Sequence, residues 1–122
     1  MRCLLIDDSP RYLRAARALL EREGVAVVGM VQTGEEALAR VADFRPDVTL
    51  VDINLRGESG FDLARRLTSA EHSGGRSQVI LLSSHSADDF EDLIESSPAA
   101  GFLDKSNLSA AAIASLVGAV GD

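Results

Sequence analysis

Five residues of this chain carry side chains suited to phosphate or metal chemistry, and each follows a short apolar run. They are Asp7, Asp8, Asp52, Ser83 and Lys105. The last of these is the only lysine among twelve basic residues, since the other eleven are arginines. A lysine ammonium is a compact, mobile charge, whereas a guanidinium is a rigid fork. This position therefore favours a contact that bridges a phosphoryl oxygen and a carboxylate.

The three carboxylates of this set indicate a bound cation. Two carboxylates about 5 Å apart repel by roughly 3 kcal/mol at an effective dielectric of about 20, and one ammonium cannot relieve three such pairs. The donors are all oxygens, without histidine or cysteine nearby, and such a donor set selects Mg²⁺ or Mn²⁺. Ser83 adds a hydroxyl donor for a phosphoryl oxygen.

Five short apolar runs precede these residues, and we predict that the runs are β-strands. They are leucine-rich or β-branched and continuous rather than alternating, which is typical of strands buried on both faces in a parallel sheet. The runs are 4–6, 25–30, 48–51, 79–82 and 101–103.

Amphipathic segments alternate with the runs and are predicted to be helices. The first is expected to end at Gly24. The predicted starts are the N-cap Ser9 with Pro10, the capping box of Thr33 and Glu36, a start near Gly60, the acidic run around Phe90, and a cap at Ser106 or Asn107.

This alternation predicts an α/β fold, a (βα)5 flavodoxin-like doubly wound sheet of five parallel strands in the order 2-1-3-4-5. In such folds ligands bind beyond the carboxyl ends of the strands, at the switch point between the first and third strands. The five residues named above stand at those strand ends, so we expect them to converge on one edge of the sheet.

Length and composition set limits on the function. A chain of 122 residues with 46% hydrophobic and 25% charged residues is expected to form one globular domain, not a multi-domain enzyme or a disordered tail. A net charge of −7 disfavours nucleic-acid binding by this segment. No apolar stretch reaches the roughly 20 residues of a membrane span, and the start lacks a secretory signal. Cys3 is expected to be a buried thiol, and the protein to be cytoplasmic.

In the order and spacing of its motifs, the whole chain resembles the receiver domain of two-component response regulators, the CheY-like family. The residues that carry this resemblance are Asp7 and Asp8 after Ile6, Asp52, Gly60 eight residues later, Ser83, Phe102 and Lys105. The resemblance implies one receiver domain over residues 1–122. It also implies a signalling switch rather than an enzyme, although the domain takes part in its own phosphotransfer and dephosphorylation.

The resemblance also implies roles for individual residues at the metal. Asp52 would be the phosphoacceptor. Asp8 and Asp52 would bind Mg²⁺ directly, Asp7 through water, and the backbone carbonyl of Asn54 would complete the protein ligands. Transfer would be in line, with the protein supplying positioning and charge neutralisation.

The remaining implied roles concern the phosphoryl group and the response to it. Ser83, the backbone amide of Ser84, and Lys105 would bind the phosphoryl oxygens. Phe102 stands at the position of an aromatic switch, where its ring would move into space left when Ser83 shifts; the alternative is a core phenylalanine. His85 is expected in a loop near the mouth of the site.

The resemblance further implies partners. A sensor histidine kinase or phosphotransfer protein would donate the phosphoryl group. The first helix carries a basic stripe of Arg11, Arg14 and Arg17, which would either dock this donor or simply form a solvated face. A downstream protein or output domain would respond, and a phosphorylation-dependent homodimer is compatible with this scheme. The segment 105–108 is similar to receivers that precede a LuxR-like helix-turn-helix, so the chain is either a stand-alone regulator or an excised domain.

Two other functions compete with the switch. A metal-dependent phosphohydrolase of similar topology normally has an acid two residues after its nucleophile, where this chain has Asn54. The other is a flavin-binding or purely structural module of flavodoxin-like topology. Flavin binding would need a Ser/Thr/Gly-rich phosphate loop after the first strand, where Asp8-Ser9-Pro10 would instead repel a phosphate in the absence of a metal.

Overall fold

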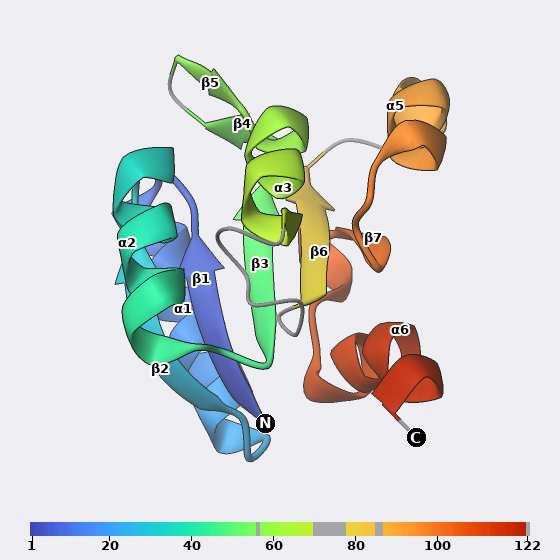
Figure 1. Cartoon of the computed structure of the whole chain (residues 1–122). Helices are drawn as coiled ribbons and strands as arrows, with labels where there is room; N and C mark the ends of the chain where they lie inside the picture. The colour runs from blue at the N-terminus through green and yellow to red at the C-terminus, as the bar shows by residue number, and fades with distance from the viewer. Residues whose placement is uncertain (56, 70–77, 85–86, 122) are drawn as a thin grey trace.

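The computed structural model describes residues 1–55, 57–69, 78–84 and 87–121, with side chains for all of these except 87 and 118–121. A five-stranded parallel sheet in the order β2-β1-β3-β6-β7 forms its centre (Figure 1). The strands are β1 (Arg2–Ile6), β2 (Ala26–Val31), β3 (Val48–Asp52), β6 (Gln78–Ser83) and β7 (Gly101–Asp104). The predicted fold class and strand order 2-1-3-4-5 are confirmed.

Helices cover both faces of the sheet, as expected of a doubly wound fold (Figure 1). Helices α1 and α6 pack on one face with the buried residues Cys3 and Leu5, whereas α2, α3 and α5 pack on the other with Leu4 and Ile6. The helices are α1 (Pro10–Arg22), α2 (Gly34–Phe44), α3 (Gly60–Thr68), α5 (Glu91–Ser96) and α6 (Ala110–Gly121). Among the described residues, no helix has the length and apolar character needed to cross a membrane.

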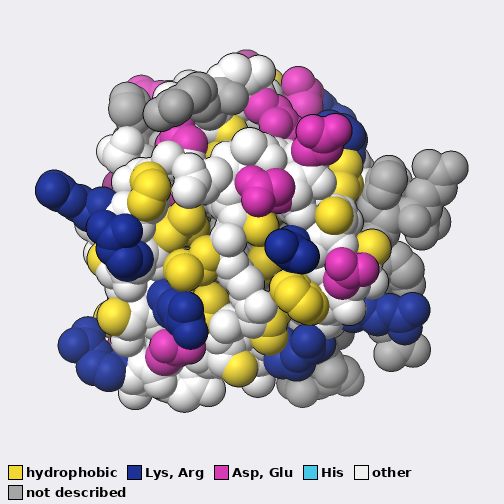
Figure 2. Space-filling model, turned by 90° about the vertical axis from the view of Figure 1, so that its left-hand side faces the viewer, with side chains coloured by type: hydrophobic (Ala, Val, Ile, Leu, Met, Phe, Trp, Pro, Cys, Tyr) yellow, Lys and Arg dark blue, Asp and Glu magenta, His cyan; other side chains and the backbone are white. Residues whose placement is uncertain are grey.

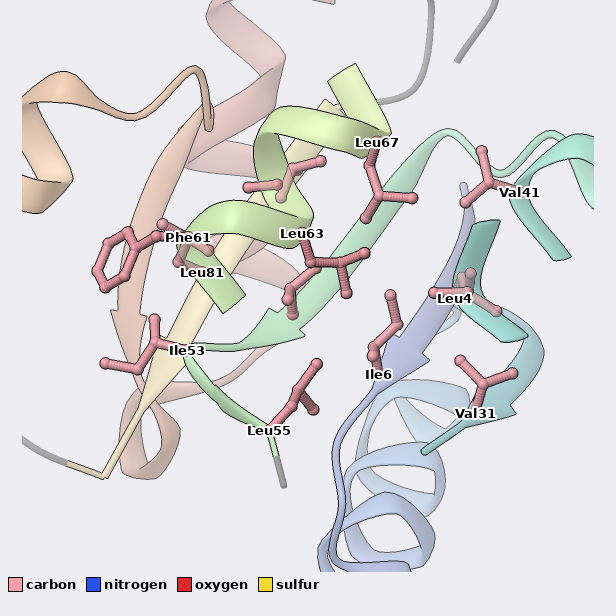
Figure 3. Close-up of a cluster of buried hydrophobic side chains, with 14 residues drawn as sticks. Leu4, Ile6, Val31, Val41, Ile53, Leu55, Phe61, Leu63, Leu67 and Leu81 are labelled. Carbon is pink, nitrogen blue, oxygen red and sulfur yellow. The ribbon is translucent and has the colours of Figure 1, made fainter. Parts of the chain in front are cut away.

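Alternation of side chains along each strand divides the core into two layers. In β1, Leu4 and Ile6 point to the layer that Figure 3 shows, where Leu63 and Leu67 of α3 and Val41 of α2 meet the sheet. Cys3 and Leu5 point to the opposite layer. The strands are hydrophobic throughout because each of their faces is covered, which explains the continuous apolar runs.

The first two helix starts are confirmed in detail. The hydroxyl of Ser9 accepts a hydrogen bond from the backbone N–H of Tyr12 at 3.2 Å, and Pro10 is the first helical residue. Thr33 Oγ1 accepts a hydrogen bond from the Glu36 N–H at 3.2 Å and donates to the Glu36 carboxylate at 3.3 Å. Both caps satisfy backbone donors that a helix leaves without partners.

The predicted cap of the last helix is wrong. Residues Lys105–Asn107 form a short 3-10 turn, η2, whose cap is Asp104, and α6 begins only at Ala110. Ser109 supplies the cap, because its hydroxyl accepts a hydrogen bond from the N–H of Ala112 at 3.0 Å. The side chains of Ser106, Asn107 and Ser109 can all cap a helix, so the local sequence does not determine which of them is the N-cap.

Two further features of the loops differ from the prediction. A small antiparallel hairpin, β4 (Asn54–Leu55) and β5 (Glu58–Ser59), follows β3 directly. The fourth helix is divided into a 3-10 turn, η1 (Ala87–Phe90), and the short α5. His85 lies outside the described residues.

Candidate functional site

The carboxyl ends of β1 and β3 bring the predicted acids together. These strands are neighbours in register, with Ile6 opposite Val51, so the residues that follow, Asp7 and Asp52, leave the sheet side by side. Carboxylate oxygens of Asp7, Asp8 and Asp52 lie within 4.8 Å of one another. The predicted convergence of the acids is therefore present in the structure.

Asp7 is the most enclosed of these acids, with 2% of its surface exposed. One carboxylate oxygen, Oδ1, accepts a hydrogen bond from the backbone N–H of Ser9 at 2.8 Å. The other, Oδ2, accepts one from the ammonium of Lys105 at 2.6 Å. Because both oxygens have partners, the turn that starts α1 holds this carboxylate in a single orientation.

Asp52 is held by its own loop and by the same ammonium. Its Oδ1 accepts a hydrogen bond from the N–H of Asn54 at 3.0 Å, and its Oδ2 accepts one from Lys105 Nζ at 3.3 Å. Burial raises the pKa of Asp52 above its ordinary value, the Asn54 hydrogen bond opposes this, and the charge of Asp7 adds to the increase. The positive charge of Lys105 therefore offsets the effects of burial and of the Asp7 charge on Asp52 only in part.

Lys105 reaches the acids from the fifth strand of the sheet. Strand β7 pairs with β6 so that Asp104 lies opposite Ser83, which places the next residue at the same edge as Asp7 and Asp52. Burial alone lowers the pKa of Lys105, but the hydrogen bond to Asp7 and the charges of both acids outweigh burial and leave it raised. The ammonium therefore stays charged at neutral pH.

The remaining predicted residues surround this cluster at different depths. Asp8 is half-buried, Ser83 is buried with 3% exposed, and Ser84 is exposed. Asn54 is exposed, and its backbone N–H lies beside the Asp52 carboxylate, to which it donates a hydrogen bond. Phe102 is half-buried and packs against the core layer of α2 and α3, opposite Leu81 of β6.

Gly60 lets α3 start very close to the candidate acceptor. A Cβ at this position would collide with the carbonyl oxygen of Asp52. The Gly60 N–H donates a hydrogen bond to the carbonyl of Ile53 at 2.8 Å, and Ser59 caps the helix. The φ of Gly60 is not in the left-handed region, so backbone conformation does not require glycine here. Glycine is needed because the two backbones approach each other closely.

Sequence reasoning missed Tyr12. Its ring centroid lies 4.5 Å from Lys105 Nζ, and its hydroxyl donates a hydrogen bond to the Lys105 carbonyl at 3.4 Å. Burial, followed by the charges of Asp7, Asp52 and Asp104, raises its pKa. It is the only tyrosine of the chain and shares the inner face of α1 with Ala16 and Leu20, at spacings of four and eight. That helical spacing was the sequence signal that Tyr12 lies on the inner face of the helix.

The donor set fits a hard divalent cation. Three carboxylates supply oxygen ligands within a span of 4.8 Å, and the only cation paired with them in the described part of the chain is Lys105. Such a set, rich in charge and free of nitrogen and sulfur ligands, is typical of Mg²⁺ sites that share the ion with a phosphate. Asp7, Asp8 and Asp52 are the residues that would hold it.

Comparison with known proteins identifies the family. A match to the response regulator receiver domain covers residues 3–117. The chain is 30% identical to the receiver domain of a putative response regulator NarL from Mycobacterium tuberculosis, with a TM-score of 0.77 over 99% of this chain and 93% of that one. A LuxR-family response regulator from Aurantimonas is 26% identical, with a TM-score of 0.81 over 96% and 85% of the two chains.

A curated relative extends beyond the matched region. The DNA-binding transcriptional activator EvgA of Escherichia coli strain K12 is 28% identical over 90 residues, which is 74% of this chain but 42% of the relative. The chain thus spans less than half of that protein. The family match over nearly the whole chain, together with the five-stranded fold and the acidic edge, shows that the chain belongs to the response regulator receiver domains of two-component systems.

Proposed function

We propose that the chain is a phosphoacceptor switch in which Asp52 receives a phosphoryl group from a sensor histidine kinase, a phosphotransfer protein or a small phosphodonor. The observation that carries the proposal is the position of Lys105 Nζ, 2.6 Å from Asp7 and 3.3 Å from Asp52 at the point where three carboxylates meet. An ammonium placed between two acids is suited to bind an oxygen of a phosphoryl group carried by one of them.

The proposed reaction is an in-line substitution at phosphorus. A carboxylate oxygen of Asp52 forms a bond to phosphorus while the bond to the leaving group breaks, and that bond's electron pair leaves with the donor. The leaving group is the imidazole nitrogen of a phosphohistidine, which takes a proton from solvent, or the acetate oxygen of acetyl phosphate. Water later attacks phosphorus, releasing phosphate and restoring the carboxylate.

Asp52, rather than its neighbours, is the acid best suited to act as nucleophile. Both oxygens of Asp7 accept short hydrogen bonds, at 2.8 and 2.6 Å, whereas the contact of Asp52 Oδ2 with Lys105 is longer at 3.3 Å. Asp8 is only half-buried, whereas Asp52 is buried with 5% of its surface exposed. A bound Mg²⁺ would neutralise part of the negative charge on the carboxylates and the phosphoryl oxygens.

Ser83, the backbone amide of Ser84 and Lys105 are the groups proposed to bind the phosphoryl oxygens. Ser83 ends β6 next to the end of β3, where Asp52 lies opposite Leu82. Its hydroxyl is buried at the same edge of the sheet. Movement of Ser83 toward the phosphate would leave space for the ring of Phe102, which lies one strand away on β7.

The first helix is the proposed docking site for the phosphodonor protein. Arg11, Arg14 and Arg17 are exposed on α1, and Arg17 forms an ion pair with Glu21 at 3.3 Å. The side of the molecule that includes α1 and the edge strand β2 carries basic side chains around visible hydrophobic ones (Figure 2). A helix with an acidic and apolar face would complement this surface.

Intact mass spectrometry tests the proposal most directly. After incubation with acetyl phosphate and Mg²⁺, the wild-type chain should gain the mass of one phosphoryl group. Asp52→Asn should not gain it, whereas Asp62→Asn, an exposed acid of α3, should be labelled like wild type. Labelling that persists in Asp52→Asn would assign the acceptor elsewhere.

Other outcomes of the same experiment identify other functions. A chain that stays unmodified and turns over phosphate esters would be a phosphohydrolase. A chain that purifies with a yellow chromophore would be a flavin-binding module. Either outcome would replace the switch proposal.

A further inference from the structure

The only tyrosine and the only lysine of the chain are in contact at two points. Lys105 Nζ lies 4.5 Å from the centroid of the Tyr12 ring, and the Tyr12 hydroxyl donates a hydrogen bond to the Lys105 carbonyl at 3.4 Å. We infer that Tyr12 is a positioning residue, which holds the Lys105 side chain between Asp7 and Asp52 with its ring. This inference rests on the proposed function, because Lys105 acts there on the phosphoryl group.

The contacts of Tyr12 complete a closed network of interactions around the start of α1. The Ser9 N–H donates to Asp7 Oδ1 at 2.8 Å, and the Tyr12 N–H donates to the Ser9 hydroxyl at 3.2 Å. The Tyr12 ring then meets the Lys105 ammonium, which donates back to Asp7 Oδ2 at 2.6 Å. The same helical turn therefore orients the carboxylate and the aromatic face that the ammonium contacts.

The chemistry of an ammonium explains why a ring is useful here. Lysine has a flexible four-carbon stem and three donors without the fixed geometry of arginine, so its position depends on its surroundings. Asp7 and Asp52 restrain the ammonium from one side, and the Tyr12 ring presents its negative face from another. Only 18% of the Lys105 side chain is exposed, so little water competes with these contacts.

A simpler role for Tyr12 is packing alone. Its ring also contacts the core layer between the sheet and helices α1 and α6. The two roles differ in what a substitution can replace. Leucine fills apolar space but has no π face, whereas phenylalanine keeps the face and removes only the hydroxyl, whose 3.4 Å bond is long and weak.

The rate experiment compares Tyr12→Leu and Tyr12→Phe with the wild-type chain. Each is incubated with acetyl phosphate and Mg²⁺, and labelling is followed by intact mass. Loss of the cation–π contact should slow labelling of Tyr12→Leu on the order of three- to tenfold. Tyr12→Phe should stay within about twofold of wild type, because it retains the interaction with the ring face. Leu19→Ala, a substitution elsewhere on α1 in the same core layer, controls for loss of packing.

A second readout is independent of labelling. Because the chain has one lysine and one tyrosine, their side-chain NMR signals need no assignment among copies. In the wild-type protein we expect nuclear Overhauser contacts between the Tyr12 ring protons and the terminal methylene of Lys105. The lysine methylene signal should move downfield in Tyr12→Leu, where the ring current is lost, and stay near its wild-type position in Tyr12→Phe.

These outcomes separate this inference from the proposed function. If wild type and Asp52→Asn are both unlabelled, the proposed function fails, and the positioning role for phosphotransfer fails with it even where the NMR contact is present. If wild type is labelled normally and Tyr12→Leu is labelled at the same rate, only the role of Tyr12 is overturned. Absence of the Overhauser contact in wild type overturns it as well, even where Tyr12→Leu does not fold.

Discussion

Lys105 lies closer to Asp7 than to Asp52: its ammonium is 2.6 Å from Asp7 Oδ2 and 3.3 Å from Asp52 Oδ2. The lysine is thus paired mainly with the acid that is not the proposed acceptor. Asp7 is also the more enclosed of the two acids. A phosphoryl group on Asp52 would need only a small displacement of the ammonium to gain a direct contact.

Replacement of Lys105 by arginine should impair phosphorylation even though the charge is retained. A rigid, planar guanidinium cannot occupy the compact position between the two carboxylates that the ammonium occupies. We expect labelling by acetyl phosphate to slow by about tenfold or more. Arg65→Lys, at an exposed ion pair with Asp62, is the matched control and should label like wild type. Equal rates for the two variants would contradict the special role of this lysine.

Replacement of Asp52 by asparagine should stabilise the fold when divalent cations are absent. The pKa of Asp52 is raised in the folded chain, mainly by burial, so the folded chain holds this proton more tightly than the unfolded chain. Its contribution to stability is therefore present at low pH and lost as pH rises through the folded-state value. Asparagine carries no charge, so the variant does not lose this stability as pH rises. Lys105 keeps its closer ion-pair partner, Asp7, in the variant.

Urea denaturation at pH 7 in the presence of a chelator measures this effect. The Asp52→Asn midpoint should lie above that of wild type, and the difference should shrink as pH is lowered through the raised folded-state pKa of Asp52. Added Mg²⁺ should raise the wild-type midpoint more than that of the variant, because a ligand stabilises the folded state that binds it. A wild-type chain that is more stable than the variant in chelator would show that Lys105 compensates the carboxylates fully.

Gly60→Ala should disturb both the fold and the site. The new Cβ would collide with the Asp52 carbonyl, so the start of α3 or the end of β3 must shift. We expect a loss of roughly 1–3 kcal/mol in the free energy of unfolding, as for other overpacked sites, and slower labelling of Asp52. Gly57→Asn is the control, since nothing lies within 4 Å of its Cβ and asparagine tolerates its φ of 70°.

Charge reversal at Arg14 should affect one kind of phosphodonor only. Arg14 is exposed on α1 and is not one of the residues proposed to bind the metal or the phosphoryl group. Arg14→Glu should therefore slow transfer from the cognate kinase and leave labelling by acetyl phosphate intact. Arg40→Glu, an equal reversal on α2, should affect neither reaction. Equal loss with both donors after Arg14→Glu would argue against a docking role for α1.

Cys3 should be unreactive while the chain is folded. Its thiol is fully buried in β1, and burial raises its pKa to about 12, so thiolate is scarce at pH 8. Iodoacetamide should modify the chain in urea but not in buffer. Ionisation of this thiol also favours unfolding as pH rises from 9.0 toward about 12. Rapid alkylation in native buffer would contradict the burial of this strand.

The sequence alone was sufficient for the five strands of the main sheet and for the acids at their ends, but not for the hairpin of β4 and β5 or for the division of the fourth helix. Continuous apolar runs marked each strand of the main sheet, and caps such as Ser9 and Thr33 marked helix starts, because these signals act between residues at most four apart. The strand order then followed from the rules of doubly wound folds. Asp7 and Asp52 could be placed together because parallel strands end at one edge.

Only the tertiary structure decided how the side chains meet. Tyr12 and Lys105 are 93 residues apart, and Asp7 and Lys105 are 98 apart, so no local pattern links them. The cap at Ser109 was equally beyond local rules, since neighbouring residues have the same capping ability and the packing of α6 chose among them. Sequence periodicity reports which face a residue occupies, whereas the distances between charged groups depend on how separate elements pack.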